Sequence, residues 1–393
     1  MRLAYTTEQE QLRKELRAYY RDLLDDDTRA ALKESHGIGP AMRSVVKQMG
    51  ADGWLGIGWP TEYGGQGRGP VDQFIFFDES MRAGAPVPML TINSVAPTIM
   101  SFGSDEQKER FLPAILRGEL HFCIGYSEPE AGTDLASLKT RAHLDGDDYV
   151  VQGSKLWTSL ASDADYCWLA VRTGAEDSRH RGISILIADM SSPGITATPM
   201  SLLSDHNICT VAWDDVRVPA SNLVLGQDKG WQLITNQLNH ERVTLCSPGM
   251  AENVLHETIA WAKAERLPDG RRVIDQEWVR VNLARAWSGF EFLRLANWRV
   301  AAAADLDPSD LPIADASTIK VFGTEHYLEV FRLCMEVVGE RAALQEGSPG
   351  AVLGQRLEAL YRSLLILTFG GGTNELQRDL IATFGLGMPM AKR

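Results

Sequence analysis

The stretch Leu365–Gln377 reads LILTFGGGTNELQ, which is an apolar run followed by three glycines and a threonine. It lies within the last of four long helical stretches that carry apolar stripes. Residues that break helices separate these stretches, which are Trp231–Glu265, Gln276–Asp305, Asp315–Val338 and Val352–Phe384. Four long helices in succession predict a helical bundle, and we expect this bundle to form the spine of the chain.

A region with a different sequence pattern precedes these helices, from about residue 121 to residue 227. It contains short runs with a period near two, separated by Gly, Asp, Ser or Pro: Tyr149–Val151, Tyr166–Val171, Ile183–Ala188 and Val211–Val218. Frequent turns between short strands predict a small antiparallel barrel or sandwich.

The first part of the chain alternates helical stretches with loops rich in Gly and Pro. Thr7 and Glu10 have the spacing of a capping box, and the charges that follow argue against a signal peptide. A further short helix, capped at Ser104 or Asp105, is expected at Ser104–Leu116. We therefore predict an α+β fold with three domains: an N-terminal α-helical domain (1–120), a middle β domain (121–228) and a C-terminal α-helical bundle domain (229–393).

The composition excludes several classes of function. Lys and Arg number 39 and Asp and Glu number 52, so the net charge of −13 argues against binding to nucleic acid or to an anionic membrane surface. The longest apolar runs, such as Leu364–Phe369, are far too short to span a bilayer. The five cysteines are scattered and form no CxxC pair, as expected for buried free thiols in a reducing cytoplasm, which is where we expect the protein.

Motifs for several common chemistries are missing from the sequence. His240-Glu241 and His256-Glu257 lack a second His four residues after the first, so neither predicts a zinc site. No nucleophile elbow, P-loop or glycine-rich dinucleotide fingerprint occurs. On pattern alone, each of these two Glu residues is most simply a solvated helix residue.

Two segments of the middle region carry small hydroxyls and an aromatic side chain. Ile124–Asp134 reads IGYSEPEAGTD, and Lys155–Ser159 reads KLWTS. A planar redox ring needs an aromatic wall, apolar packing and a few fixed donors at its polar edge, and these segments supply such parts. An ordinary loop and a Trp of the core explain the same residues, so both interpretations stay open on pattern alone.

The order of these motifs along the chain resembles that of the acyl-CoA dehydrogenases. Tyr126–Asp134 is similar to the flavin loop of that family, Lys155–Ser159 to its Trp-Ile-Thr segment, and Asp214–Pro219 to the passage that ends its β domain. The resemblance covers essentially the whole chain. It implies N-terminal helices, a middle β domain and a C-terminal four-helix bundle, with FAD held among them.

The resemblance also implies which residues bind the cofactor. Ser127 would contact the pyrimidine end of the flavin, Trp157 would pack on the ring, and Ser159 would lie near N5. Thr133 would contact the cofactor or the thioester region of the substrate. The set of cofactor-binding residues that the resemblance implies is Tyr126, Ser127, Thr133, Trp157, Ser159, Thr373 and Arg266.

The glycine turn lacks the family's usual catalytic carboxylate. Gly371 takes the place of the Glu in the family's aromatic-Glu-Gly-Thr turn, and Gly372 and Thr373 match the residues after it. In other members the base lies on an earlier helix, one position before an Arg, where this chain has Glu241 and Arg242. The resemblance therefore implies that Glu241 is the catalytic base and that the backbone N–H of Gly371 holds the thioester oxygen. Arg242 would orient the loop or the CoA end of the substrate, or form a structural ion pair.

Two elements that serve a neighbouring subunit in the family differ here. The Gln-x-x-Gly-Gly-x-Gly turn appears as Glu336–Ala342, with Glu340 where a second Gly is expected. A carboxylate there would repel the FAD pyrophosphate. The Arg-x-x-Phe-Gly element appears as Arg266–Gly270 without its aromatic residue. The features that hold this chain's own flavin thus look intact, while those that complete a partner's site do not.

This combination is most similar to one subunit of the bacterial heteromeric acyl-CoA dehydrogenases that shorten steroid side chains. It implies FAD-dependent α,β-dehydrogenation of an acyl-CoA thioester, and the analogy suggests a bulky or steroid side chain as the acyl group. The implied partners are a homologous acyl-CoA dehydrogenase subunit, in an α2β2 assembly, and an electron-transfer flavoprotein. The alternatives are a non-catalytic structural subunit, which the lost carboxylate at Gly371 favours, and a flavin oxidase or monooxygenase on the same fold.

Overall fold

The computed structural model describes residues 4–389 except 36–37, 205, 245 and 307–312, and for residues 238–244, 305 and 306 it describes the backbone alone. By its internal contacts the chain forms two units. The first unit comprises Met1–Asp22, Gly69–Ala85 and Arg242–Arg393, and the second comprises Leu23–Arg68 and Pro86–Glu241. Within the described ranges, no helix is long and apolar enough to cross a membrane.

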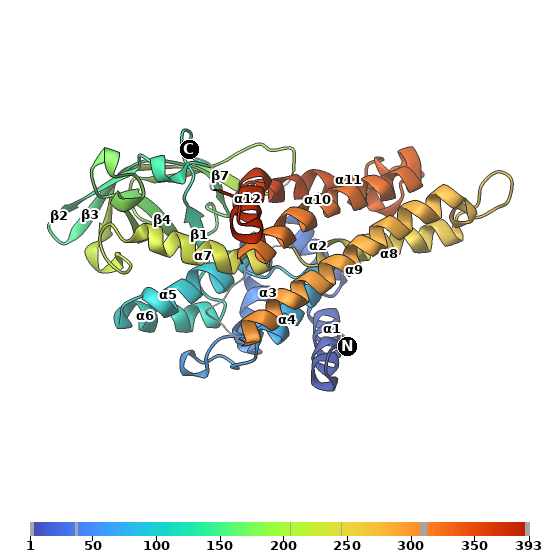
Figure 1. Cartoon of the computed structure of the whole chain (residues 1–393), viewed down its shortest axis with the longest axis horizontal. Helices are drawn as coiled ribbons and strands as arrows, with labels where there is room; N and C mark the ends of the chain where they lie inside the picture. The colour runs from blue at the N-terminus through green and yellow to red at the C-terminus, as the bar shows by residue number, and fades with distance from the viewer. Residues whose placement is uncertain (1–3, 36–37, 205, 245, 307–312, 390–393) are drawn as a thin grey trace. The chain divides into compact units, whose positions relative to one another are not determined.

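The first unit is helical. Its helices are α1 (Thr7–Leu23, whose last residue falls in the second unit), α4 (Pro70–Ala83), α8 (Gly249–Ala264), α9 (Glu277–Leu306), α10 (Ile313–Val338), α11 (Arg356–Leu364) and α12 (Asn374–Leu380). The helices α8 and α9 run alongside each other, and α10 packs against α8, α9 and α11 (Figure 1). Their shared core includes Leu255, Phe290, Tyr327 and Phe331. The expected C-terminal bundle is therefore confirmed.

Two of the predicted long helices are interrupted. The stretch 231–265 is divided between α7, which ends at Thr244, and α8, which begins directly after Pro248. Proline is well suited to the start of a helix and poorly suited to its interior. The last stretch is divided by the glycine turn, where Gly371 and Gly372 have φ values of +69° and +88°. Such left-handed conformations end a helix and favour glycine.

Buried charges join four helices of the first unit. Glu79 of α4 accepts from Arg17 of α1 at 2.7 Å, and Arg82 of α4 contacts Glu252 of α8 at 2.5 Å. Glu252 also accepts from Arg294 of α9 at 2.7 Å. The cap of α1 differs from the prediction: Gln9 and Thr6, not Glu10 and Thr7, exchange the two capping hydrogen bonds, because the helix begins one residue earlier than expected.

The second unit combines helices with a sheet. Its helices are α2 (Asp26–Glu34), α3 (Gly39–Ala51), α5 (Ala96–Phe102), α6 (Asp105–Leu116) and α7 (Gly230–Thr244, whose last residues fall in the first unit). Its strands are β1 (Phe122–Gly125), β2 (Arg141–Asp145), β3 (Asp148–Ser159), β4 (Tyr166–Arg172), β5 (Ile183–Asp189), β6 (Ile195–Pro199) and β7 (Ile208–Pro219). The four predicted strands lie in β3, β4, β5 and β7. Of the two expected caps, Ser104 is the one that caps α6, and it forms a capping box with Gln107.

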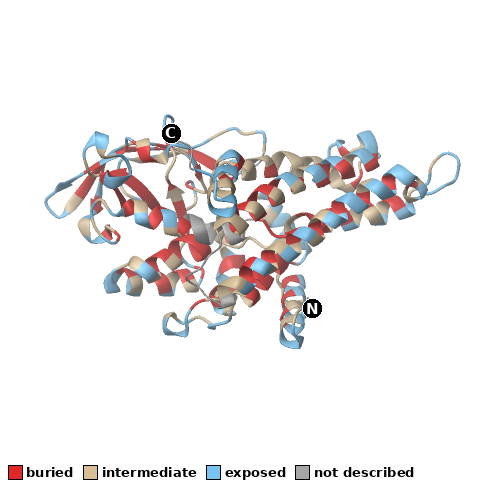
Figure 2. Cartoon of the chain, viewed as in Figure 1, coloured by how far each residue is buried: buried red, intermediate tan, exposed pale blue. Residues whose placement is uncertain are grey.

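The strands of the second unit form one sheet in the order β1-β4-β2-β3-β7-β6, with β5 paired to β4. The expected purely antiparallel arrangement is wrong, because β4 pairs in parallel with β1 and β2. The intervening hairpin of β2 and β3 gives the chain enough length to bring β4 alongside β1 in the same direction. Buried residues run along most of the strands, as Figure 2 shows in red, and Trp168 and Trp213 are among the fully buried ones.

Helical N- and C-terminal parts, with a sheet between them in the sequence, confirm the α+β fold. All five cysteines are free and buried, as the sequence predicts. The boundaries at about residues 120 and 228 stay a prediction about folding domains. By contacts, α1 and α4 group with the C-terminal helices, because α4 packs against α8 and α9 and Arg17 of α1 pairs with Glu79 of α4.

Candidate active site

The loop after β1 lies against β3 in the second unit. The N–H of Leu156 in β3 donates to the carbonyl of Ser127 at 2.9 Å. Within the loop, Glu128 and Ala131 exchange two backbone hydrogen bonds, which close a tight turn. The structure therefore brings together two segments that the sequence singles out separately, Tyr126–Asp134 and Lys155–Ser159.

A buried ion pair fixes this loop. Nζ of Lys155 lies 2.7 Å from Oε1 of Glu128 and 3.1 Å from the carbonyl of Tyr126, and the Lys155 side chain is fully buried. The carboxylate of Glu128 also accepts from the backbone N–H groups of Lys139 at 2.6 Å and Thr140 at 2.9 Å. Burial opposes ionisation of Glu128, but Lys155 and these donors hold its pKa below the usual value. Burial lowers the pKa of Lys155, and Glu128 opposes that shift.

Trp157 is presented to solvent by an irregularity in β3. The pairing of β3 with β7 shifts register between Lys155 and Thr158, and Trp157 takes a φ of +63°. A bulky residue rarely adopts such a conformation, and bulges of this kind redirect a side chain. Trp157 is 53% exposed, although it lies within a strand. The neighbouring hydroxyl of Ser159 is half-buried at the end of the same strand.

Tyr126 connects the loop to α7. Its hydroxyl donates to Oε1 of Gln237 in α7 and accepts from Nε1 of Trp168 at 3.1 Å. Gln237 precedes Glu241 by four residues, so the two positions share one face of the helix. The side chains of Glu241 and Arg242 lie outside the described residues. The sequence did not lead us to predict a role for Gln237. The signal that could have pointed to it is its position as a polar residue one helical turn before the candidate base, Glu241.

Thr133 lies on the exposed part of the loop. Asp134, the next residue, forms an ion pair with Arg179 at 2.6 Å. Thr133 is thus accessible on the same loop as Ser127, and its role in binding cofactor or substrate stays a prediction.

The glycine turn belongs to the first unit. Thr373 caps α12 by accepting from the N–H of Leu376 at 3.2 Å. Nε2 of Gln377 donates to the carbonyl of Gly371 at 3.0 Å. Nζ of the buried Lys320 in α10 donates to the carbonyl of Gly372 at 2.8 Å. Side chains of α10 and α12 therefore hold the turn by hydrogen bonds to its carbonyl groups.

Arg266 lies in a different part of the first unit. It is exposed, and its guanidinium donates to the carbonyl of Gly270 at 3.2 Å within its own hairpin. The adjacent Glu265 pairs with Arg341 at 2.8 Å, and Arg341 also donates to the carbonyl of Gly350. Glu265 and Arg266 follow the end of α8, and Arg341 follows the C-terminal end of α10, whereas Lys320 lies in the first third of α10. The two regions stand about 30 Å apart along the helix, at about 1.5 Å per residue.

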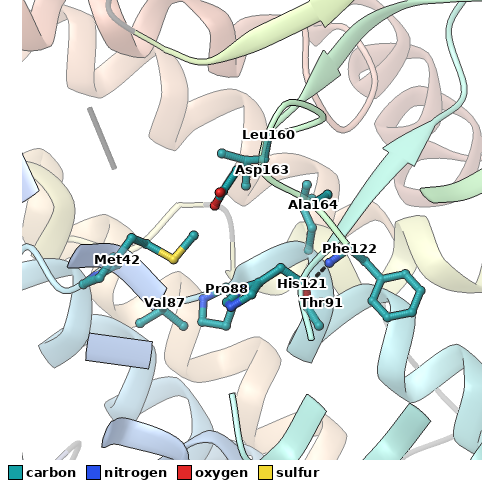
Figure 3. A pocket seen from close by; sticks show the side chains of 11 residues that line it. Met42, Val87, Pro88, Thr91, His121, Phe122, Leu160, Asp163 and Ala164 are labelled. Atoms are coloured by element: carbon teal, nitrogen blue, oxygen red, sulfur yellow. Dashed lines mark hydrogen bonds between the residues drawn. The ribbon is translucent and has the colours of Figure 1, made fainter. Parts of the chain in front are cut away.

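A cavity of about 90 Å³ lies within the second unit, between α3, the loop before α5 and the start of β1 (Figure 3). Its wall is mostly apolar, as Met42 and Pro88 illustrate, and none of the residues expected to bind flavin or substrate lines it. Nε2 of His121 is buried and has no hydrogen-bond partner among the described residues. Burial and the charge of Arg43 lower the pKa of His121, so the ring is neutral at pH 7. The cavity suits a water molecule or a small group with one polar atom.

The residues of the loop and of β3 fit a flavin. The exposed indole of Trp157 offers a face for a planar ring, and Ser127 and Ser159 place hydroxyls on the adjoining backbone segments. An aromatic wall beside hydroxyls, on a β domain that interrupts a helical chain, is the arrangement of a flavoprotein dehydrogenase.

Comparison with known proteins agrees with this class. Family models match residues 6–119 (Acyl-CoA dehydrogenase, N-terminal domain), 123–216 (Acyl-CoA dehydrogenase, middle domain) and 228–386 (Acyl-CoA dehydrogenase, C-terminal domain). The chain belongs to the acyl-CoA dehydrogenase family and is an oxidoreductase of that kind.

Similar proteins resemble the chain over its whole length. Acyl-CoA dehydrogenase FadE26 of Mycobacterium tuberculosis is 53% identical, with 100% of each chain covered. A chain of the ChsE4-ChsE5 complex from Mycobacterium tuberculosis is also 53% identical and matches with a TM-score of 0.93 and 100% coverage of both chains. A chain of the Tcur3481-Tcur3483 steroid ACAD is 45% identical, again with a TM-score of 0.93 and 100% coverage of both chains.

Proposed function

We propose that this chain catalyses the FAD-dependent α,β-dehydrogenation of an acyl-CoA thioester, with Glu241 as the base. The observation that carries the proposal is the anchoring of α7. Gln237 ties this helix to the flavin loop through Tyr126, and Glu241 follows one turn later on the same face. The turn at Gly371 offers no carboxylate for the same task.

Each residue has a distinct part in this reaction. Ser127 and Ser159 would donate hydrogen bonds to the polar edge of the flavin, and Trp157 would pack against its ring. Glu241 removes the α-proton of the substrate, and desolvation by the bound acyl chain raises its basicity. The backbone N–H of Gly371 donates to the thioester oxygen as negative charge develops there. FAD, when bound, would supply the acceptor for the β-hydride.

Replacing Glu241 by Gln tests the assignment of the base. We expect a loss of turnover on the order of 10²–10⁴-fold with nearly unchanged flavin content, because a general base is lost and the isosteric amide keeps the packing. Glu257→Gln is the matched control, since Glu257 also follows a His but pairs with Arg356 at 2.6 Å. Turnover of Glu241→Gln within about tenfold of wild type would falsify the assignment.

We further propose that the active form is a heteromer with a homologous chain, as in the ChsE4-ChsE5 complex to which this chain is similar. Glu340 and the ion pair of Arg341 with Glu265 occupy the region where the family's glycine-rich turn serves a neighbour's FAD. In a homo-oligomer every flavin would lose about two or three charge-assisted hydrogen bonds, worth roughly 1.5–3 kcal/mol each.

Expression alone and with homologous partner chains tests this arrangement. We expect little flavin in the chain alone, and about one FAD per heterodimer in an α2β2 assembly, read from the ratio of visible to ultraviolet absorbance. A homotetramer that purifies alone with a full complement of FAD and full activity would refute the heteromer but not the chemistry.

The similarity to a steroid ACAD motivates a bulky or steroid side chain as the acyl group. The proposed electron acceptor is an electron-transfer flavoprotein. Anaerobic turnover of acyl-CoA with such an acceptor separates a dehydrogenase from an oxidase, which requires O2.

A further inference from the structure

A buried ammonium group lies directly behind the glycine turn of the first unit. Lys320 is fully buried in α10, between Ile319 and Val321. Its Nζ donates to three oxygens: the carbonyl of Thr368 at 3.3 Å, the carbonyl of Gly372 at 2.8 Å and Oδ1 of Asn374 at 2.7 Å. The side chain of Lys320 thus binds Thr368, which lies before the glycines, as well as Gly372 and Asn374 at the end of the turn.

Together these bonds fix the peptide planes around Gly371. Lys320 holds the Gly372 carbonyl, and Gln377 holds that of Gly371. Before the turn, the N–H of Gly370 donates to the carbonyl of Ile366 at 3.0 Å. The Gly371 N–H lies in the peptide group between Gly370 and Gly371, and the planar peptide groups before and after it are the held ones. Because both neighbouring groups are held, the peptide group between them has little freedom to turn.

The N–H of Gly371 itself is available. It donates to no backbone or side-chain acceptor among the described residues, although its neighbours on both sides are held. A half-buried N–H group that is fixed in direction but has no internal acceptor is suited to bind an external oxygen.

We propose that Lys320 is a positioning residue for the Gly371 N–H, which it aims at the thioester oxygen of the substrate. The inference rests on the proposed function and adds to it the residue that holds the oxygen-binding turn in place. The charge of Lys320 contributes as well, because a cation behind the turn favours the negative charge that develops on the substrate oxygen.

The test replaces Lys320 by Met in the FAD-loaded enzyme, assembled with its partner chain where that is needed for flavin binding. We expect kcat to fall about 10–100-fold with KM changed much less, because the contact to the oxygen strengthens in the transition state. Cys334→Ala is the control, since Cys334 is buried in the same helix but four turns from Lys320, and kcat should stay within about twofold.

Binding supplies a readout that a purely structural role would not move. We compare an enoyl-CoA thioester with an acyl-CoA thioether, which lacks the carbonyl oxygen, by the perturbation of the flavin absorbance. In Lys320→Met the affinity for the thioester should fall about tenfold, while that for the thioether should stay within about twofold. Where Lys320→Met does not fold, Lys320→Gln, which keeps one amide donor, should show the same pattern at smaller size.

Two outcomes overturn the inference while leaving the proposed function intact: unchanged kcat in a folded Lys320→Met enzyme, or an equal loss of affinity for thioester and thioether. Failure of the proposed function looks different, because the wild-type enzyme would then oxidise no acyl-CoA at all.

Discussion

Lys155 of the second unit and Lys320 of the first unit are both fully buried, yet their surroundings differ. Lys155 faces the carboxylate of Glu128 at 2.7 Å. The three described acceptors of Lys320 are two backbone carbonyls and the side-chain oxygen of Asn374. Each lysine holds a segment that we propose for the active site: the loop Tyr126–Asp134 in one unit and the glycine turn in the other.

The difference concerns what remains when the lysine is removed. Without Lys155, a charged carboxylate stays buried, and an uncompensated buried charge is costly. Without Lys320, the acceptors it leaves among the described residues are neutral oxygens, each of which costs less. The loop is therefore secured by a pair of opposite charges, whereas these three contacts of Lys320 hold the turn through hydrogen bonds to neutral oxygens.

The largest effect should follow from breaking the ion pair. We expect Lys155→Met to lower the free energy of unfolding by about 3–5 kcal/mol, because Glu128 is left without its counter-charge. Urea denaturation measures this loss. Lys320→Met should cost less in the same assay, about 1–3 kcal/mol, since it orphans neutral acceptors.

A double variant provides the control for charge. Lys155→Met combined with Glu128→Gln should recover part of the stability, because the buried carboxylate is gone. If the double variant is no more stable than Lys155→Met alone, the loop is not secured by its charges.

An intermediate effect, on turnover, is expected from placing a carboxylate in the glycine turn. The turn would then carry an acidic side chain, as the loop does with Glu128. Glu241→Gly with Gly371→Glu moves the base to the family's commoner position. Some turnover above the Glu241→Gly single variant should return, well below wild type. Position 371 has a φ of +69°, which costs a non-glycine residue about 1–2 kcal/mol. If the double variant binds FAD normally but is no faster than the single variant, the two positions do not serve the same substrate atom.

The smallest expected effect is on how the free energy of unfolding changes with pH in acid. The pKa of Glu128 is lowered in the folded chain, so the stabilisation it provides is present above the usual Glu pKa and is lost as pH falls through its folded value. The free energy of unfolding should therefore drop less steeply below about pH 4.5 in Glu128→Gln than in wild type. Denaturation midpoints between neutral and acid pH measure the difference, and parallel curves for the two proteins would contradict it.

Much of the fold follows from local patterns. The strand Tyr166–Val171 and the helix that begins after Ser104 were predictable because strand periodicity and helix caps act over a few residues. The parallel pairing of β1 with β4 was not, because the turns between neighbouring strands do not reveal which distant strand completes a sheet.

The candidate site divides in the same way. Ser127, Trp157 and Gly371 are recognisable from motifs, and their roles stay proposals. Lys155 lies inside a motif that the sequence analysis recognised, but that analysis gave it no role. Its partner Glu128 lies 27 residues earlier, so no local pattern links the two. For Lys320 there was a signal, a single Lys among Ile319, Val321 and Phe322 in a helical stretch, but no local pattern names the turn that it holds.

By itself, the sequence determined the family, the kinds of secondary structure and the missing carboxylate at position 371, because each of these is written in neighbouring residues. Only the tertiary structure decided where the buried charges find partners. Lys320 meets Gly372 across 52 residues and Gln237 meets Tyr126 across 111. A buried polar group must be satisfied by whatever the chain's topology brings within about 3 Å, and that distance is set by the packing of whole helices and strands.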